Sequence, residues 1–179
     1  MKKLTLLICF VVCIANSQNN EDSSYASFKL NEIALLNIEP SNSTVILNLG
    51  SPEFSGDKIE MIAVINTKWI NFTSSLSKNA APRNISVKIE DGEVPPGISL
   101  KLKTDSYSGS GKGILGINSD IISLSKKSQS IVTEIGGAYT GYGTNNGYKI
   151  TYLLDIYDYK LLNMNESEVL TISLTLTDF

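Results

Sequence analysis

Apolar and polar residues alternate along much of this 179-residue chain, and this alternation predicts β-strands. The clearest case is the C-terminal segment, where leucine and isoleucine alternate with serine and threonine. A period of two places one face of a strand on a core and the other in solvent. The pattern predicts strands at residues 44–49, 61–65, 68–73, 85–90, 98–103, 130–135, 148–156 and 170–177.

One further segment, residues 28–38, has mixed parity. Phe28 and Leu30 occupy even positions, whereas Ile33 and Leu35 occupy odd positions, which predicts a β-bulge or a strand that changes sheets. No window carries the i, i+3, i+4 apolar stripe of an amphipathic helix. Eight or nine strands without helices predict an all-β fold. We expect an antiparallel β-sandwich, Ig-like or pilin-like, with a barrel as the minor alternative.

The first residues carry an export pattern. Residues 1–17 combine two lysines, an apolar run from Leu4 to Ala15 and small side chains at Ala15 and Ser17, which predicts a secretory signal peptide. An uncleaved membrane anchor fits less well, because polar residues follow at once. Lipid attachment at Cys9 or Cys13 also fits less well, because isoleucine or valine precedes each cysteine.

If the signal peptide is removed, the rest of the chain should form a leader and one domain. After the signal peptide we expect a flexible polar leader over residues 18–27 and a single β-sandwich domain over residues 28–179. The expected location is the periplasm, the outer surface or the extracellular space. No other apolar run reaches spanning length, so we expect no transmembrane helix after cleavage.

The amino-acid composition excludes several kinds of catalytic and metal-binding site. The chain has no histidine, which excludes Ser-His-Asp catalysis and HExxH zinc sites. Cleavage would remove both cysteines and two lysines, so the net charge would change from −3 to −5 with no thiol left for a disulfide or a metal. An acidic chain without a basic stripe is a poor partner for nucleic acid. We therefore expect no cofactor, no metal ion and no nucleic-acid partner.

Aromatic residues are the candidate ligand-binding groups. Trp69 is the only tryptophan, and Tyr139 and Tyr142 lie in a glycine-rich stretch, since nine of the thirteen glycines fall between Gly109 and Gly147. Exposed aromatic rings in loops can stack on sugar rings or on a partner. The alternative for Trp69 is a core position between the sheets.

Carboxylates form the second group of candidates. They occur as Asp155 and Asp158 near one strand end, and as Glu90, Asp91 and Glu93 in one turn. Neither spacing is diagnostic of a glycosidase pair or of a calcium site. A solvated turn is the simpler interpretation, so we expect that the protein is not an enzyme.

A family resemblance rests on five segments: residues 34–40 (ALLNIEP), 69–74 (WINFTS), 94–100 (VPPGISL), 137–152 and 174–179 (LTLTDF). Together they resemble secreted β-sandwich proteins of Bacteroidetes-type bacteria and, more distantly, the spore coat protein U and fimbrial-subunit group. The resemblance implies an exported β-sandwich and carries no functional residue over.

These observations lead to one expected function and one alternative. We expect an exported, non-enzymatic structural or adhesive surface subunit that pairs with itself or with other surface subunits through edge strands. The alternative is a carbohydrate-binding module that uses the loop aromatics, with glycans as partners.

Overall fold

The computed structural model describes residues 25–163 and 167–178. The predicted signal peptide at 1–17 and residues 18–24 of the predicted leader lie outside the described residues. The chain divides into two units, Met1–Leu30 and Asn31–Phe179. In the first unit, residues 25–30 have no regular secondary structure, and the side chains of Tyr25, Phe28 and Leu30 are 97%, 86% and 94% exposed.

The second unit is built of antiparallel strands. Nine described strands have five or more residues and four have two. The strands are β1 (Ile33–Glu39), β2 (Ile46–Gly50), β3 (Glu60–Ile65), β4 (Thr67–Ser75), β5 (Arg83–Asp91), β6 (Ile98–Thr104), β7 (Lys112–Gly113), β8 (Ile117–Asn118), β9 (Ile122–Ser123), β10 (Gln129–Ile135), β11 (Ala138–Tyr139), β12 (Tyr148–Ile156) and β13 (Thr171–Asp178). A short 3-10 helix, η1 (Tyr159–Leu161), follows β12.

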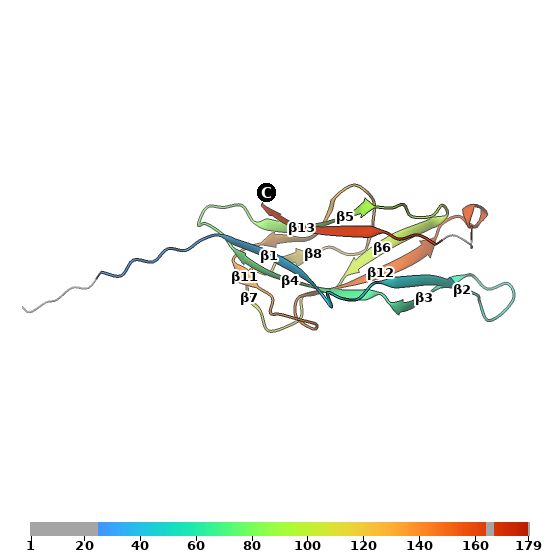
Figure 1. Cartoon of the computed structure of the whole chain (residues 1–179), viewed down its shortest axis with the longest axis horizontal. Helices are drawn as coiled ribbons and strands as arrows, with labels where there is room; N and C mark the ends of the chain where they lie inside the picture. Colours follow the sequence, from blue (N-terminus) through green and yellow to red (C-terminus); the bar gives the residue numbers. More distant parts are fainter. Residues whose placement is uncertain (1–24, 164–166, 179) are drawn as a thin grey trace, which may run out of the picture. The chain divides into compact units, whose positions relative to one another are not determined.

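These strands form two main sheets and a ribbon (Figure 1). The seven-stranded sheet has the order β7-β11-β4-β12-β6-β9, with β1 paired to β4. The four-stranded sheet has the order β13-β5-β10-β8, and β2 pairs with β3 alone. The predicted all-β sandwich is therefore confirmed.

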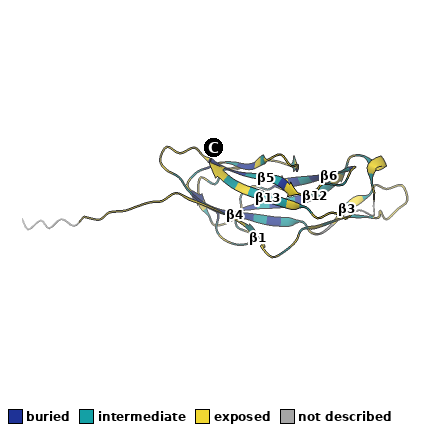
Figure 2. Ribbon diagram, turned by 45° about the horizontal axis from the view of Figure 1, so that its top comes forward, coloured by how far each residue is buried: buried dark blue, intermediate teal, exposed yellow. Residues whose placement is uncertain are grey.

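The core lies between the two main sheets, where burial is deepest (Figure 2). Phe72 of β4 and Tyr148 of β12 stack with ring centroids 6.4 Å apart, and the ring of Tyr107 meets Tyr148 edge-on at 5.9 Å. The Tyr148 hydroxyl lies 3.0 Å from the carbonyl oxygens of Leu115 and Gly116, so its polar end is satisfied inside the core. The fully buried aliphatic residues are Ile70, Ile85, Val87, Leu102, Ile131, Val132, Ile135 and Ile150.

The predicted irregularity in residues 28–38 is wrong. Only residues 33–39 form a strand, and β1 pairs with β4 in unbroken register from Ile33 opposite Ser75 to Glu39 opposite Trp69. Leu36 packs against the core, whereas Ile33 and Leu35 are 42% and 63% exposed. The change of parity has another cause, because Phe28 and Leu30 precede the strand and Ile33 and Leu35 lie on its outer face.

The connection from β5 to β6 crosses between the sheets. Residues 92–97 leave the four-stranded sheet and enter the seven-stranded sheet, so these consecutive strands do not pair. Gly97 has a φ of +83°, a conformation that favours glycine, and its amide lies 3.3 Å from the Tyr157 hydroxyl. The turn-rich composition of this segment thus serves a change of sheet.

The edges of the sandwich are unequal. On one side, β1 and β13 are edge strands of seven and eight residues, and they lie next to each other. The other edge strands of the two main sheets, β7, β8 and β9, have two residues each. There residues 117–125 pass from the four-stranded to the seven-stranded sheet, with the amides of Ser119 and Leu124 donating to Ile131 and Leu100, both at 2.8 Å.

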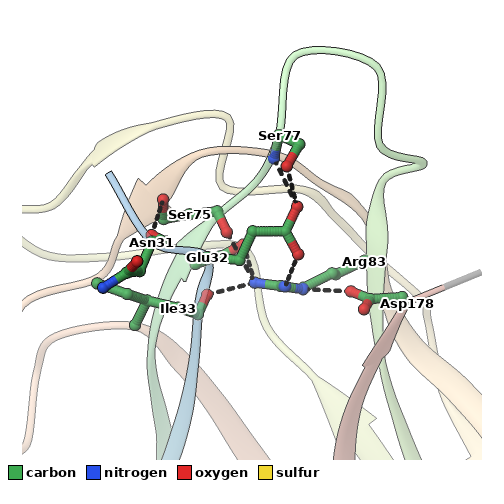
Figure 3. A network of polar contacts seen from close by, with 8 residues as sticks. Asn31, Glu32, Ile33, Ser75, Ser77, Arg83 and Asp178 are labelled. Atoms are coloured by element: carbon green, nitrogen blue, oxygen red, sulfur yellow. Dashed lines mark hydrogen bonds and ion pairs between the residues drawn. The ribbon is translucent and has the colours of Figure 1, made fainter. Parts of the chain in front are cut away.

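A single arginine joins the strands at one end of this unit (Figure 3). The side chain of Arg83 is 4% exposed, and its Nε lies 2.5 Å from Oδ1 of Asp178. Its Nη1 donates to the carbonyl oxygen of Ile33 and, at 3.3 Å, to that of Ser75. Arg83 thereby ties the start of β1, the end of β4 and the end of β13 to β5.

Glu32 completes this Arg83 network. Its carboxylate lies 3.9 Å from Nη2 of Arg83 and accepts hydrogen bonds from the hydroxyl and the amide of Ser77. These hydrogen bonds, with the nearby guanidinium, lower the pKa of Glu32. The network therefore fixes the point at which the chain enters the sandwich.

Candidate functional site

Trp69 lies on the outer face of the seven-stranded sheet. It alternates along β4 with Lys68 and Ile70, which are buried on the inner face, and its own side chain is only half-buried. The alternative core position between the sheets is therefore not what the structure shows. Directly opposite Trp69 are Glu39 on β1 and Lys149 on β12.

Tyr139 lies on the same outer face. Its neighbour on β11, Ala138, is buried, and the Tyr139 side chain is 47% exposed. Tyr139 is opposite Thr73 of β4 and Lys112 of β7. Thr73 is four residues beyond Trp69 on β4, so the two aromatic positions are about 13 Å apart along the strand.

Tyr142 belongs to the loop between β11 and β12, and its side chain is 81% exposed. Asn71, which lies between Trp69 and Thr73 on the outer face, holds this loop. Its Oδ1 accepts from the amide of Gly143 at 2.8 Å, and its Nδ2 donates to the carbonyl oxygens of Gly143, at 3.2 Å, and of Asn146. The three candidate aromatics are thus brought to one face of one sheet.

The two glycine-rich stretches pair with each other. β7 pairs with β11, and Ser108 forms a bridge with Gly147. A Cβ atom on Gly111 would lie 2.0 Å from the carbonyl oxygen of Tyr139, and one on Gly147 would lie 2.0 Å from that of Ile70. These glycines allow backbones to approach where no other residue fits, which explains their concentration in this part of the sequence.

Lysines accompany the aromatics on this face. Lys149 is opposite Trp69 and Lys112 is opposite Tyr139, and within the described residues neither lysine has a carboxylate within ion-pair distance. The neighbouring lysines on β6 differ, because Lys101 lies 2.5 Å from Asp155 and Lys103 lies 2.8 Å from Asp105.

Each ion pair on β6 shifts a pKa in the direction that favours the charged form. The Lys101 ammonium lowers the pKa of Asp155 through a hydrogen bond and its charge, and Asp105 raises the pKa of Lys103 in the same way. The sequence singled out the aromatics but gave no sign that Lys112 and Lys149 accompany them, because that grouping depends on strand pairing.

Four of the five candidate carboxylates, Glu90, Glu93, Asp155 and Asp158, have hydrogen-bond or ion-pair partners nearby. Asp158 accepts a hydrogen bond from the Lys160 amide at 2.9 Å and caps η1. Glu90 pairs with Lys88 at 2.8 Å, and Glu93 pairs with Lys126 at 3.0 Å. In the described part of the chain, no group of three or more histidine, cysteine, aspartate or glutamate residues is placed to hold a metal ion.

A separate apolar groove opens between β2, β6, β12 and the start of β13. Its volume is about 560 Å³. Among its lining side chains are Leu47, Ile98, Leu154, Leu170 and Ile172. It therefore lies at the end of β13 opposite to Asp178 and the Arg83 network. The sequence did not predict this groove, because it is formed by strands far apart along the chain.

Comparisons with known proteins identify no relative. No family model, no curated protein and no solved structure matches this chain. Across residues 25–163 and 167–178, no helix has the length and hydropathy needed to cross a membrane. Functional conclusions for this chain therefore rest on its own residues.

Proposed function

We propose that this protein is an exported, non-enzymatic structural or adhesive surface subunit that assembles with further copies by strand pairing at the β13 edge. The proposal rests on the difference in length between the edge strands on the two sides of the sandwich. Monomeric β-proteins protect long edges with lysine, proline, bulges or short strands. β13 has eight residues, contains no lysine or proline, and carries a charge only at Asp178; its one register irregularity lies at its start, between Thr171 and Ile172.

The apolar groove extends this edge. Leu170 and Ile172, before and at the start of β13, line the groove. A strand that pairs with the start of β13 would therefore direct alternate side chains into apolar surroundings. Main-chain hydrogen bonds would then supply affinity, and the groove would supply specificity.

The segment just before the sandwich has the pattern of such a strand. Phe28 and Leu30 alternate with Ser27 and Lys29, and both apolar side chains are at least 86% exposed. We infer that Phe28 and Leu30 of one copy enter the groove of a second copy. Burying two large apolar side chains that are exposed in the single chain contributes about 3–6 kcal/mol before the costs of association.

The geometry of the second unit favours head-to-tail assembly. The chain enters this unit at the Arg83 network, beside Asp178, whereas the groove is at Ile172, about 20 Å away along β13. A contact between unlike surfaces at two separate places does not close on itself unless the rotation makes a ring. Filaments or rings are the expected products.

Electron microscopy of the purified protein, together with an unboiled denaturing gel, tests this proposal. Filaments or rings, and a ladder of bands that boiling removes, are expected. The double substitution Phe28→Ala/Leu30→Ala should abolish assembly without lowering the melting temperature, because both side chains are exposed in the single chain.

Phe54→Ala is the matched control, because Phe54 is 66% exposed and lies between β2 and β3. This variant should assemble normally. A protein that remains monomeric at every concentration contradicts the proposal, as does an assembly that the Phe28→Ala/Leu30→Ala variant forms equally well.

A second candidate function is glycan binding, and a separate observation favours it. The predicted ligand-binding residues Trp69, Tyr139 and Tyr142 come from β4, β11 and the following loop, yet they belong to one sheet face. This outer face is distinct from the β13 edge, so one molecule can carry both functions. Binding to a glycan array that Trp69→Ala and Tyr139→Ala remove is the expected result, and an array without signal contradicts this function.

A further inference from the structure

We propose that the outer face of the seven-stranded sheet binds an acidic polysaccharide, with Trp69 and Tyr139 against the sugar rings and Lys149 and Lys112 at its carboxylates. The inference rests on the glycan-binding candidate function and assigns its ligand class. It arises from a repeated arrangement, in which each of these aromatics has a lysine directly opposite on the adjacent strand.

The pairing brings each lysine to its aromatic. Residues directly opposite in an antiparallel sheet have Cβ atoms about 4.5–5.5 Å apart. A single sugar ring lying on Trp69 would therefore have its substituents within reach of Lys149, and one lying on Tyr139 within reach of Lys112. An aromatic face stacks on the apolar face of a sugar, and an ammonium group meets a carboxylate.

Lys112 and Lys149 differ from two other lysines on the same face of the sheet. Lys101 and Lys103 on β6 are already paired with Asp155 and Asp105. Lys112 and Lys149 lack such a partner among the described residues, in a chain whose net charge is −3. The carboxylate opposite Trp69, that of Glu39, accepts a hydrogen bond from the Asn37 side-chain amide at 2.7 Å and pairs with neither lysine. The two lysines are thus available to an anionic ligand.

The spacing selects an extended ligand. The two aromatic–lysine pairs are about 13 Å apart along β4, so a monosaccharide cannot contact both. The loop that Asn71 holds lies between them and carries Tyr142. The Nδ2 of Asn146 donates to the Tyr142 carbonyl oxygen at 2.9 Å, and its Oδ1 accepts from the Ser110 amide at 3.3 Å. This loop covers Asn71, which is 4% exposed, so a polymer that contacts both pairs would run over the loop and meet Tyr142 there.

Single-stranded nucleic acid also combines ring stacking with negative charge. Its binding grooves follow the phosphate backbone with many basic residues. The proposed site offers two lysines without an ion pair among the described residues, on a chain with an excess of acidic residues. The charge density therefore favours a polysaccharide, and nucleic-acid binding becomes an outcome that the experiment must distinguish.

The fluorescence of the chain's only tryptophan tests the inference directly, because Trp69 is in the site. The full chain is titrated with polygalacturonate, with dextran as a neutral polysaccharide, and with oligo(dT). The expected result is a saturable change in emission with polygalacturonate that weakens as salt is added. No change is expected with dextran or oligo(dT).

Matched variants assign the effect to residues. Lys112→Gln/Lys149→Gln should weaken polygalacturonate binding by about tenfold or more and reduce its salt dependence. Lys126→Gln/Lys101→Gln removes the same charge from lysines that are already paired and should bind normally. Tyr139→Ala should also weaken the binding of polygalacturonate, whereas Phe54→Ala should leave it unchanged.

Each remaining outcome has a definite meaning. Dextran binding that Tyr139→Ala removes would overturn the acidic ligand class and leave the glycan-binding function standing. Preferential binding of oligo(dT) would overturn both. Unchanged emission with every probe, confirmed by a glycan array without signal, would likewise overturn both.

Discussion

At the scale of single residues, two buried cations show where alternation misleads. Lys68 and Arg83 are 7% and 3% exposed, although their side chains are charged. Lys68 lies on the inner face of β4, where Nζ donates to the Pro40 carbonyl oxygen at 2.5 Å and to the Ser43 hydroxyl at 2.8 Å. Hydrogen-bond acceptors on segments far along the chain make this burial possible, and sequence spacing alone does not reveal them.

Arg83→Lys should destabilise the protein by about 1–3 kcal/mol, because a lysine cannot reach Asp178 and the carbonyl oxygens of Ile33 and Ser75 together. Urea unfolding of both proteins measures the difference. Lys88→Arg is the control, since the Lys88–Glu90 pair is exposed and a change there should stay within about 0.5 kcal/mol. Equal stability of Arg83→Lys and the parent chain contradicts the proposed anchoring role.

Two buried tyrosines, Tyr148 and Tyr152, should make the stability of the fold depend on pH above about 10. Desolvation raises the pKa of Tyr148 and of Tyr152 to about 12, from an ordinary value of 10.0. The folded protein therefore retains these protons over a range in which the unfolded chain has lost them. Their contribution to stability is complete below pH 10 and is lost as the pH rises from about 10 to 12.

Unfolding free energies measured between pH 9 and about pH 12 test this expectation. The decline should be shallower in Tyr148→Phe, which no longer titrates at that position. The variant should also be about 1 kcal/mol less stable at neutral pH, because it loses the hydroxyl bond to Leu115 or Gly116. An identical pH profile would contradict the assignment to Tyr148.

At the scale of elements, the alternation located the long strands well. The strand predicted at 148–156 has the same bounds as β12, and that at 98–103 is one residue shorter than β6. The two-residue strands β7, β8, β9 and β11 were not predicted, because a period of two cannot be recognised in two residues. Lys112 lies in β7 and Tyr139 lies in β11. The sequence therefore identified the candidate aromatic residues but did not predict which residues lie beside them.

The glycine-rich connections offer a sharp test at this scale. Gly147 has a φ of +103°, and a Cβ there would lie 2.0 Å from the Ile70 carbonyl oxygen. Gly147→Ala should destabilise the protein by more than about 1 kcal/mol and displace the loop that carries Tyr142. Gly137→Ala is the matched control, because a Cβ there would meet nothing within 4 Å, and its melting temperature should be unchanged or slightly higher. Equal melting temperatures for both variants contradict this account.

The two faces of β13 should respond differently to truncation. Leu174 packs against the core from a half-buried position, whereas Thr175 is exposed. Leu174→Ala should cost about 2 kcal/mol or more, and Thr175→Ala should stay within about 0.5 kcal/mol. Denaturant midpoints measure both, and equal effects would contradict the orientation of β13.

At the scale of the whole molecule, the fold class followed from the sequence but the sheet order did not. β5 and β6 are consecutive, yet they belong to different sheets, and β1 pairs with β4 across two intervening strands. Such pairings join residues that are far apart in the chain. The alternation of apolar and polar residues predicts strands, but it does not predict which strands pair. Both surfaces for which we propose functions, the outer face at Trp69 and the groove at Ile172, depend on that order.

The full register between β1 and β4 has a mechanical consequence. All seven residues of β1 pair with β4, and the chain enters at Ile33, beside the Arg83 network. In a head-to-tail assembly, tension would pull one end of β1 outward while the groove held the opposite end of the sandwich. β1 would then be loaded in shear, so its hydrogen bonds with β4 would have to break together rather than one by one. A subunit linked in this way would resist pulling force better than its modest size suggests.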